Sequence, residues 1–173
     1  IVLATAAPSF AATIEEATAS LEVKNYAAAQ SIAEQLARNG DVQAMMILGK
    51  LYQDGDGVTQ DLAAAMAWYG KAAEANHAPA QRALALIHLG GGLGSVDYDK
   101  GSSLMRKAAE AGDAEAQFNM GLLASGAFDN PPEWIDAARW FRLAAEKGFA
   151  AAQHQLGVLY LEGKGVGKNA VTA

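Results

Sequence analysis

The chain is 173 residues long, the size of one domain or of one short repeat array. Half of its residues are apolar (51%) and 18% are charged, a balance that excludes a disordered tail. A net charge of −6 provides no basic stripe for a nucleic acid, and the absence of cysteine excludes thiolate metal sites, a cysteine nucleophile and disulfides.

The chain opens on an apolar segment rich in small residues, which resembles the second half of a secretory signal peptide. Ser9 and Ala11 stand where signal peptidase prefers small side chains, so cleavage after Ala11 is expected. We therefore interpret residues 1–11 as a signal-peptide remnant and expect a periplasmic or secreted protein. In the alternative interpretation, this segment is an apolar extension packed on the first helix of a cytoplasmic protein. No other stretch approaches the roughly 18 apolar residues of a membrane span.

Residues 12–40 are predicted to form a shorter, divergent helical hairpin. Tyr26, Ile32 and Leu36 provide the apolar stripe of its second helix, and Gly40 ends that helix. This segment closes in the same phase as the units that follow it.

From Asp41 onward the sequence repeats with a period of 36 residues. Alanine recurs at the fourth position of every block, and the triplet Ala-Ala-Glu closes the first three blocks. Self-similarity of this kind, in constant register, is the sequence signature of a repeat protein. The predicted repeats are 41–76, 77–112, 113–148 and an incomplete 149–173.

Each repeat is predicted to contain two helices. In the first repeat, Ala44, Leu48 and Tyr52 follow the i, i+4, i+8 spacing of one apolar helix stripe. A second stripe, which includes the aromatic pair 68–69, indicates the second helix. Small residues such as Gly49 allow the two helices to approach closely, and the aromatic side chains fill the gap between them.

Turn residues separate these helices. In the first repeat the Gly-rich segment 54–58 forms the turn, and Asp61 is the expected N-cap of the helix that follows. The second helices end at residue types that accept the left-handed C′ conformation. These residues are Gly40, Asn76, Gly112 and Gly148.

The recurring pattern A-x-x-x-L-G-x-x-Y-x-x-G-x-G-V-x-x-D, followed by W-Y-x-K-A-A-E, resembles the Sel-1-like repeat, a relative of the tetratricopeptide repeat. Residues 44–74 match it almost letter for letter, and the resemblance covers residues 41–173. It implies an all-α fold, a right-handed superhelical α-solenoid of helix-turn-helix repeats. The second repeat departs from the pattern at Ala85 and His88, and the third repeat departs from it at the turn 127–132.

No group of residues indicates catalysis, a metal or a cofactor. The three histidines, His77, His88 and His154, have no i, i+3 or i, i+4 partner and no carboxylate pattern that completes a metal site. The Gly-rich segment 90–94 lacks the Lys-Ser/Thr of a phosphate loop, and the segment 54–57 lacks the remaining ligands of a calcium loop. We expect no catalytic, metal-binding or cofactor-binding residue and interpret both segments as interhelical turns.

The first helix of each repeat is expected to line the concave groove of the solenoid. By analogy with tetratricopeptide repeats, three positions per repeat face this groove, and they differ in chemistry between repeats. Lys50, Arg82 and His154 give the wall a positive or polar character, which suits an amphipathic helix or extended peptide with acidic flanks. The predicted partner-binding residues are Met46, Lys50, Gln53, Arg82, Leu86, Leu89, Phe118, Leu122, Ser125, His154, Val158 and Leu161.

One alternative concerns this wall: Leu86 and Val158 are equally consistent with burial between repeats. A second apolar patch is expected at the turn of the third repeat, formed by Phe128, Pro131, Pro132 and Trp134.

The function implied by the resemblance is that of a protein–protein interaction scaffold or adaptor, since family members include periplasmic regulators of signalling and envelope assembly. The expected partner is a protein or peptide, and further repeats or another chain are expected to cover the C-terminal end. One alternative is an exported repeat enzyme that binds or hydrolyses β-lactams, although such members are rich in the cysteine pairs absent here. A second alternative is a structural spacer.

Overall fold

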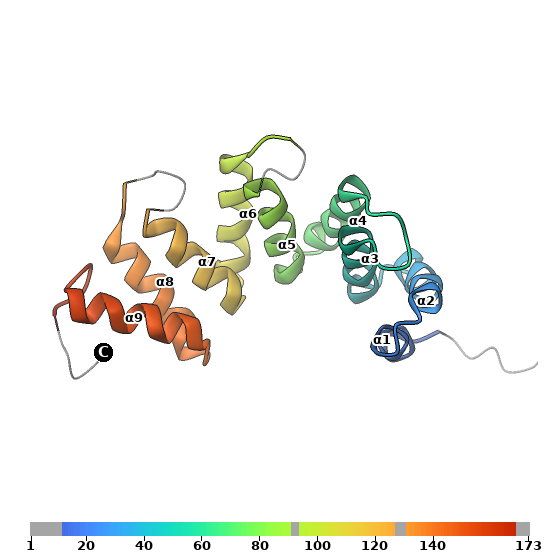
Figure 1. The fold of residues 1–173 in the computed structure, drawn as a ribbon, viewed down its shortest axis with the longest axis horizontal. Helices are drawn as coiled ribbons and strands as arrows, with labels where there is room; N and C mark the ends of the chain where they lie inside the picture. The colour runs from blue at the N-terminus through green and yellow to red at the C-terminus, as the bar shows by residue number, and fades with distance from the viewer. Residues whose placement is uncertain (1–11, 91–93, 127–130, 169–173) are drawn as a thin grey trace, which may run out of the picture. The chain divides into compact units, whose positions relative to one another are not determined.

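The computed structural model describes residues 12–90, 94–126 and 131–168, and within these ranges it contains nine α-helices and no strand (Figure 1). The expected signal-peptide remnant, residues 1–11, lies outside the described residues, as does Phe128 of the expected third-repeat patch. The helices are α1 (Ile14–Glu22), α2 (Tyr26–Arg38), α3 (Val42–Asp54), α4 (Leu62–Glu74), α5 (Ala78–Leu89), α6 (Tyr98–Glu110), α7 (Ala114–Ala124), α8 (Trp134–Glu146) and α9 (Ala150–Glu162).

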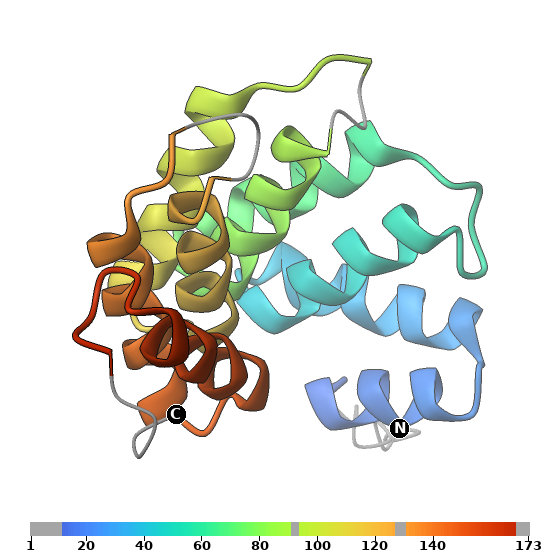
Figure 2. The same cartoon turned by 60° about the vertical axis from the view of Figure 1, so that its left-hand side comes forward.

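The helices belong to two compact units, an N-terminal unit, Ile1–Ala72, and a C-terminal unit, Ala73–Ala173. In the N-terminal unit, α1 packs on α2, and α2 packs on α3. In the C-terminal unit, each helix from α5 to α9 packs on the next one in the chain; Figure 2 shows α7, α8 and α9 as such neighbours. These successive contacts are those of stacked helical hairpins.

The cores of both units are rich in alanine, which lets helices approach closely. In the N-terminal unit, Ala33, Ala37 and Ala44 surround Leu48. In the C-terminal unit one cluster contains Met105 and Met120, and a second contains Phe141. Long side chains from one helix therefore pack over small side chains of the next.

A close approach between the two helices of a repeat is confirmed at Gly49 and Gly121. A Cβ atom at Gly49 would collide with the ring of Tyr69, and one at Gly121 would collide with the ring of Phe141. Both aromatic residues are buried. The glycine of the first helix and the aromatic residue of the second helix thus form one packing motif, as the sequence predicted.

Aspartate side chains cap the N-termini of several helices by accepting a backbone N–H of the first turn. Asp61 accepts the N–H of Ala64 at 3.0 Å, which confirms its predicted role. The other aspartate caps are Asp41, Asp97 and Asp113.

The predicted ends of the second helices are confirmed. Asn76 adopts the left-handed conformation with φ 59°, and the glycines at the three equivalent positions have φ between 81° and 94°. Asparagine adopts this conformation at lower cost than most residues that carry a Cβ. The three glycines are Gly40, Gly112 and Gly148.

A glutamine near the start of three first helices ties neighbouring repeats together. Gln117 Nε2 donates to the carbonyl oxygen of Ala109 at 3.0 Å, across the loop between α6 and α7. The same carbonyl oxygen also accepts the backbone N–H of Gly112 at 3.0 Å, so the glutamine side chain supplies its second hydrogen bond. The repeat pattern in the sequence did not predict a role for this glutamine position. At the equivalent positions of the neighbouring repeats, Gln81 donates to the carbonyl oxygen of Ala73 at 3.4 Å, and Gln153 donates to that of Ala145 at 3.2 Å.

Candidate protein-interaction surface

An apolar cavity of about 280 Å³ opens in the C-terminal unit among α5, α6 and α7. We call it the leucine cavity. Leu86 and Leu122 are 45% and 37% exposed, whereas Leu89 is buried in its wall. Exposed leucines at a cavity are typical of an interaction site, because they lose contact with water when a partner binds. The cavity is lined by Leu86, Leu89, Gly90, Met105, Asn119, Leu122 and Leu123.

The repeat pattern explains why these leucines remain exposed. Leu84 and Met120 face the core, and Leu86 and Leu122 follow them by two residues. Two residues correspond to a rotation of about 200° around an α-helix, so the second side chain of each pair points away from the core. The structure therefore settles the alternative left open for Leu86, which is exposed and not buried between repeats.

Asn119 adds a polar group to the wall of the leucine cavity. Its side-chain amide makes no hydrogen bond with any described residue and is partly exposed. A primary amide offers both donors and an acceptor, so it can bind the N–H and the C=O of a peptide backbone. The cavity can thus accept an apolar side chain beside a hydrogen-bonded main chain.

The predicted groove residues of the first repeat lie in the N-terminal unit, where Met46 and Lys50 line a separate cavity of about 260 Å³ beside α1. Lys50 forms an exposed ion pair with Asp54 at 2.8 Å. Gln53 lies beside this cavity and accepts a hydrogen bond from the hydroxyl of Tyr69 at 2.8 Å.

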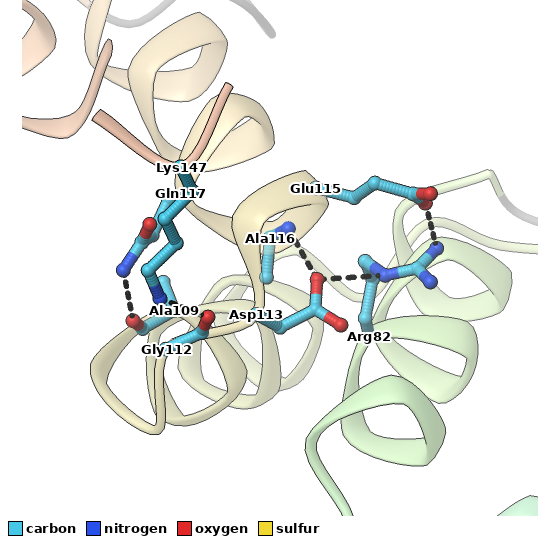
Figure 3. A network of polar contacts seen from close by, with 8 residues as sticks. All are labelled: Arg82, Ala109, Gly112, Asp113, Glu115, Ala116, Gln117 and Lys147. Atoms are coloured by element: carbon cyan, nitrogen blue, oxygen red, sulfur yellow. Dashed lines mark hydrogen bonds and ion pairs between the residues drawn. The ribbon is translucent and has the colours of Figure 1, made fainter. Parts of the chain in front are cut away.

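Arg82 is paired within the chain and does not present a free positive charge (Figure 3). Its Nε lies 3.0 Å from an oxygen of Asp113, and its Nη1 lies 2.6 Å from an oxygen of Glu115. The same Asp113 oxygen accepts the N–H of Ala116 at 2.7 Å. The expectation of a positive wall at this position is therefore wrong, because these carboxylates at the start of α7 already neutralise the guanidinium.

Phe118 lies in the same repeat column as Arg82, and it too contacts the following repeat. Its ring centroid is 5.2 Å from that of Phe149 and 5.7 Å from that of Phe141. Phe149 stands in the repeat column of Asp113. One pair of columns therefore joins adjacent repeats through an ion pair at one junction and through aromatic contact at the next.

A family comparison identifies the repeats. The model of the Sel1 repeat matches residues 42–77, 78–113, 114–149 and 150–173. The chain belongs to the Sel1 repeat family. Sel1 repeat proteins are in general protein-interaction scaffolds without enzymatic activity.

Two solved structures are similar in both sequence and fold. A Sel1 repeat protein from Oxalobacter formigenes is 32% identical, with a TM-score of 0.83 over 91% of this chain and 64% of that one. A protective antigen with an SLR fold, from uropathogenic Escherichia coli strains, is 34% identical, with a TM-score of 0.77 over 83% of this chain and 31% of that one. The chain thus spans less than two thirds of either protein.

A third structure shares the fold alone. A protein described as a Sel1 repeat protein from Klebsiella pneumoniae is 22% identical, with a TM-score of 0.62 over 90% of this chain and 78% of that one. No curated protein matches the chain significantly.

The remaining predicted residues of the Sel1 repeats lie at the C-terminal end of α7 and on α9. The hydroxyl of Ser125 donates to the carbonyl oxygen of Gly121 at 2.7 Å and so closes the end of α7. On α9, His154 and Leu161 are exposed, and Val158 is partly exposed in the repeat column of Leu86 and Leu122.

The expected patch at the turn of the third Sel1 repeat is described only in part. Pro131 and Pro132 are exposed, whereas Trp134 is partly buried, and the ammonium group of Lys164 lies 4.6 Å from its ring centroid. Trp134 packs against the core cluster that contains Phe141. This tryptophan therefore stabilises the packing of α8 against α9.

In the parts of the chain that the structure describes, no helix has the length and apolar character needed to cross a membrane.

Proposed function

We propose that this Sel1 repeat protein binds a partner protein or peptide at the leucine cavity of its C-terminal unit. The observation that carries this proposal is the exposure of Leu86 and Leu122 at one apolar cavity, on a repeat whose family binds proteins. Burying a leucine side chain fully contributes about 1.5–3 kcal/mol. An apolar anchor of the partner that covers both leucines would therefore supply a large share of the affinity.

The interaction extends beyond the cavity. A stable protein interface buries a total of about 1,200–2,000 Å², much more than one such cavity offers. Val158 continues the column of Leu86 and Leu122 onto α9. We therefore propose a contact along the first helices α5, α7 and α9, with the leucine cavity as its centre.

The expectation of acidic flanks rests on Lys50, Arg82 and His154 together, and of these Arg82 is paired with Asp113 and Glu115. We propose that apolar contact and the amide of Asn119 select the partner, and that acidic flanks contribute little.

The proposal is tested with a photo-crosslinking amino acid placed at position 122 of the full chain in its native host. Position 143 serves as the control, because Leu143 on α8 has the same 37% exposure and does not line the cavity. We expect a defined crosslinked partner from position 122 only, and at least tenfold weaker binding of that partner by Leu122→Glu than by Leu143→Glu. Equal crosslinking from both positions, or equal loss of affinity, would show that the protein does not use this surface.

We also propose that the protein is exported and acts in the periplasm or outside the cell, as a regulator of signalling or envelope assembly. The export rests on the sequence of residues 1–11, and the regulatory role rests on the resemblance to the Sel1 repeat family. N-terminal sequencing of the protein from its native host tests it, since export predicts a mature chain that starts at or near Ala12. Recovery from the cytoplasm with residues 1–11 retained would refute it.

A further inference from the structure

A second cavity, of about 340 Å³, lies in the C-terminal unit between α6 and α8, and residues of the C-terminal half of α7 also line it. We call it the α6–α8 cavity. It opens between two second helices, whereas the leucine cavity lies between the first helices α5 and α7. Its volume falls within the range of about 300–1,000 Å³ that is common for small-molecule sites.

The floor of the α6–α8 cavity is apolar. Met120, Leu123 and Trp140 line it and are between 4% and 8% exposed. The thioether and the indole ring are polarizable surfaces on which an aliphatic or aromatic side chain packs well. This floor favours a ligand with a large apolar group.

The two walls carry opposite charges. Arg106 lies on α6 and Glu133 immediately precedes α8, and both line the cavity. Neither forms an ion pair with a residue in the described ranges, so they do not neutralise each other across the cavity. Asp136 adds a second carboxylate to the α8 wall, although it also lies 3.4 Å from Arg139.

The Glu133 carboxylate also does not cap the helix that follows it. It occupies the N-cap position of α8, where an acidic side chain can accept a backbone N–H of the first turn. Its side chain makes no such hydrogen bond. The carboxylate is thus available to a ligand.

We propose that the α6–α8 cavity binds a free α-amino acid with a large apolar side chain. The guanidinium of Arg106 binds the α-carboxylate in the planar, bidentate manner that suits this pair. Glu133, with Asp136 beside it, binds the α-ammonium group, and the side chain packs on the floor formed by Met120, Leu123 and Trp140. This inference is independent of the partner surface at the leucine cavity, because it concerns a different ligand and a different cavity.

The affinity is expected to be modest. Arg106 and Glu133 are exposed, so water competes for both charged contacts. A ligand with the few non-hydrogen atoms of phenylalanine binds such a site with a Kd on the order of a millimolar.

The test is a titration of the full, ¹⁵N-labelled chain with phenylalanine, followed through the indole N–H resonance of Trp140 and assigned with Trp140→Phe. We expect a saturable shift with phenylalanine. Binding should weaken at least tenfold with N-acetylphenylalanine, which lacks the ammonium group, with phenylalanine amide, which lacks the carboxylate, and with glycine, which lacks the apolar side chain.

Charge-removing variants with matched controls complete the test. Arg106→Gln and Glu133→Gln should each weaken phenylalanine binding at least fivefold, whereas Lys107→Gln and Glu110→Gln, at exposed positions of α6 outside the cavity, should bind like the wild type. All four positions are exposed, so the fold is retained, which an unchanged thermal midpoint verifies. No saturable shift up to about ten times the expected Kd, equal binding of the blocked forms, or equal behaviour of the four variants would overturn the proposal.

Discussion

Arg82 and Asp113 are joined by a 3.0 Å ion pair that links α5 of the second repeat to the start of α7 in the third. Their side chains are only 22% and 10% exposed, so the pair is shielded from solvent more than the other ion pairs among the described residues. The same Asp113 oxygen also caps α7. One carboxylate therefore couples the stability of a helix end to the contact between two repeats.

Arg82→Met is expected to lower the free energy of unfolding by about 1–2 kcal/mol. The substitution keeps an apolar stem but leaves Asp113, which is nearly buried, without its counter-ion. The control is Arg38→Met, which removes a 3.6 Å pair with Glu34 whose arginine is 73% exposed, and it should cost less than about 0.5 kcal/mol. Urea unfolding at 25 °C measures both changes. Similar losses for the two variants would contradict the importance of this junction.

Asp113→Asn and Asp113→Ala separate the two roles of that residue. Asparagine keeps the oxygen that accepts the Ala116 N–H and loses the negative charge, whereas alanine loses both. We expect Asp113→Ala to be less stable than Asp113→Asn by about 1 kcal/mol. In the Arg82→Met background, Asp113→Asn should cost less than it does alone, because the ion pair is already broken. Additive losses in this double-mutant cycle would argue against coupling between Arg82 and Asp113.

Gly121→Ala and Gly70→Ala are expected to change stability in opposite directions. At Gly121 the added Cβ meets the buried ring of Phe141, and the forced shift should cost about 1–3 kcal/mol. At Gly70, inside α4, no atom outside the adjacent residues and the helix's own backbone lies within 4 Å of the added Cβ, and alanine should gain up to about 1 kcal/mol in helix propensity. Thermal or urea unfolding determines both signs. Stabilisation by Gly121→Ala would refute the proposed close contact with Phe141.

Phe118→Ala is expected to lower the free energy of unfolding by about 2–3 kcal/mol. Its ring packs on Phe141 and Phe149 and is partly buried, so the loss should lie below the 3–5 kcal/mol of a fully buried phenylalanine. Leu122→Ala, on the same helix but exposed, should cost less than about 1 kcal/mol. A loss for Phe118→Ala no larger than that for Leu122→Ala would show that the contacts of Phe118 with Phe141 and Phe149 do not stabilise the fold.

The sequence predicts the helical framework well, since its signals are local or follow from the repeat period. The left-handed end at Asn76, the cap at Asp61 and the contact between Gly49 and Tyr69 each depend on residue types at fixed distances along the chain. Such features repeat in every block, so comparing the blocks reveals them.

The candidate site is harder to predict, because variation between repeats has two physical causes. A position varies when it is free to face a partner, as at Leu86 and Leu122, and it varies when its neighbour in the next repeat changes with it. Arg82 with Asp113 and Phe118 with Phe149 are of the second kind. Only a comparison of both columns together could have separated these causes before the structure was known.

The two junctions are chemically different, and this limits how the array can change in length. Excising residues 83–118 as a whole block would set the guanidinium of Arg82 against the ring of Phe149, with Asp113 and Glu115 removed. Inserting a copy of one block would create a mismatch of the same kind wherever the two columns no longer correspond. The gain or loss of a whole repeat by unequal recombination therefore requires compensating substitutions on both sides of the new junction between repeats.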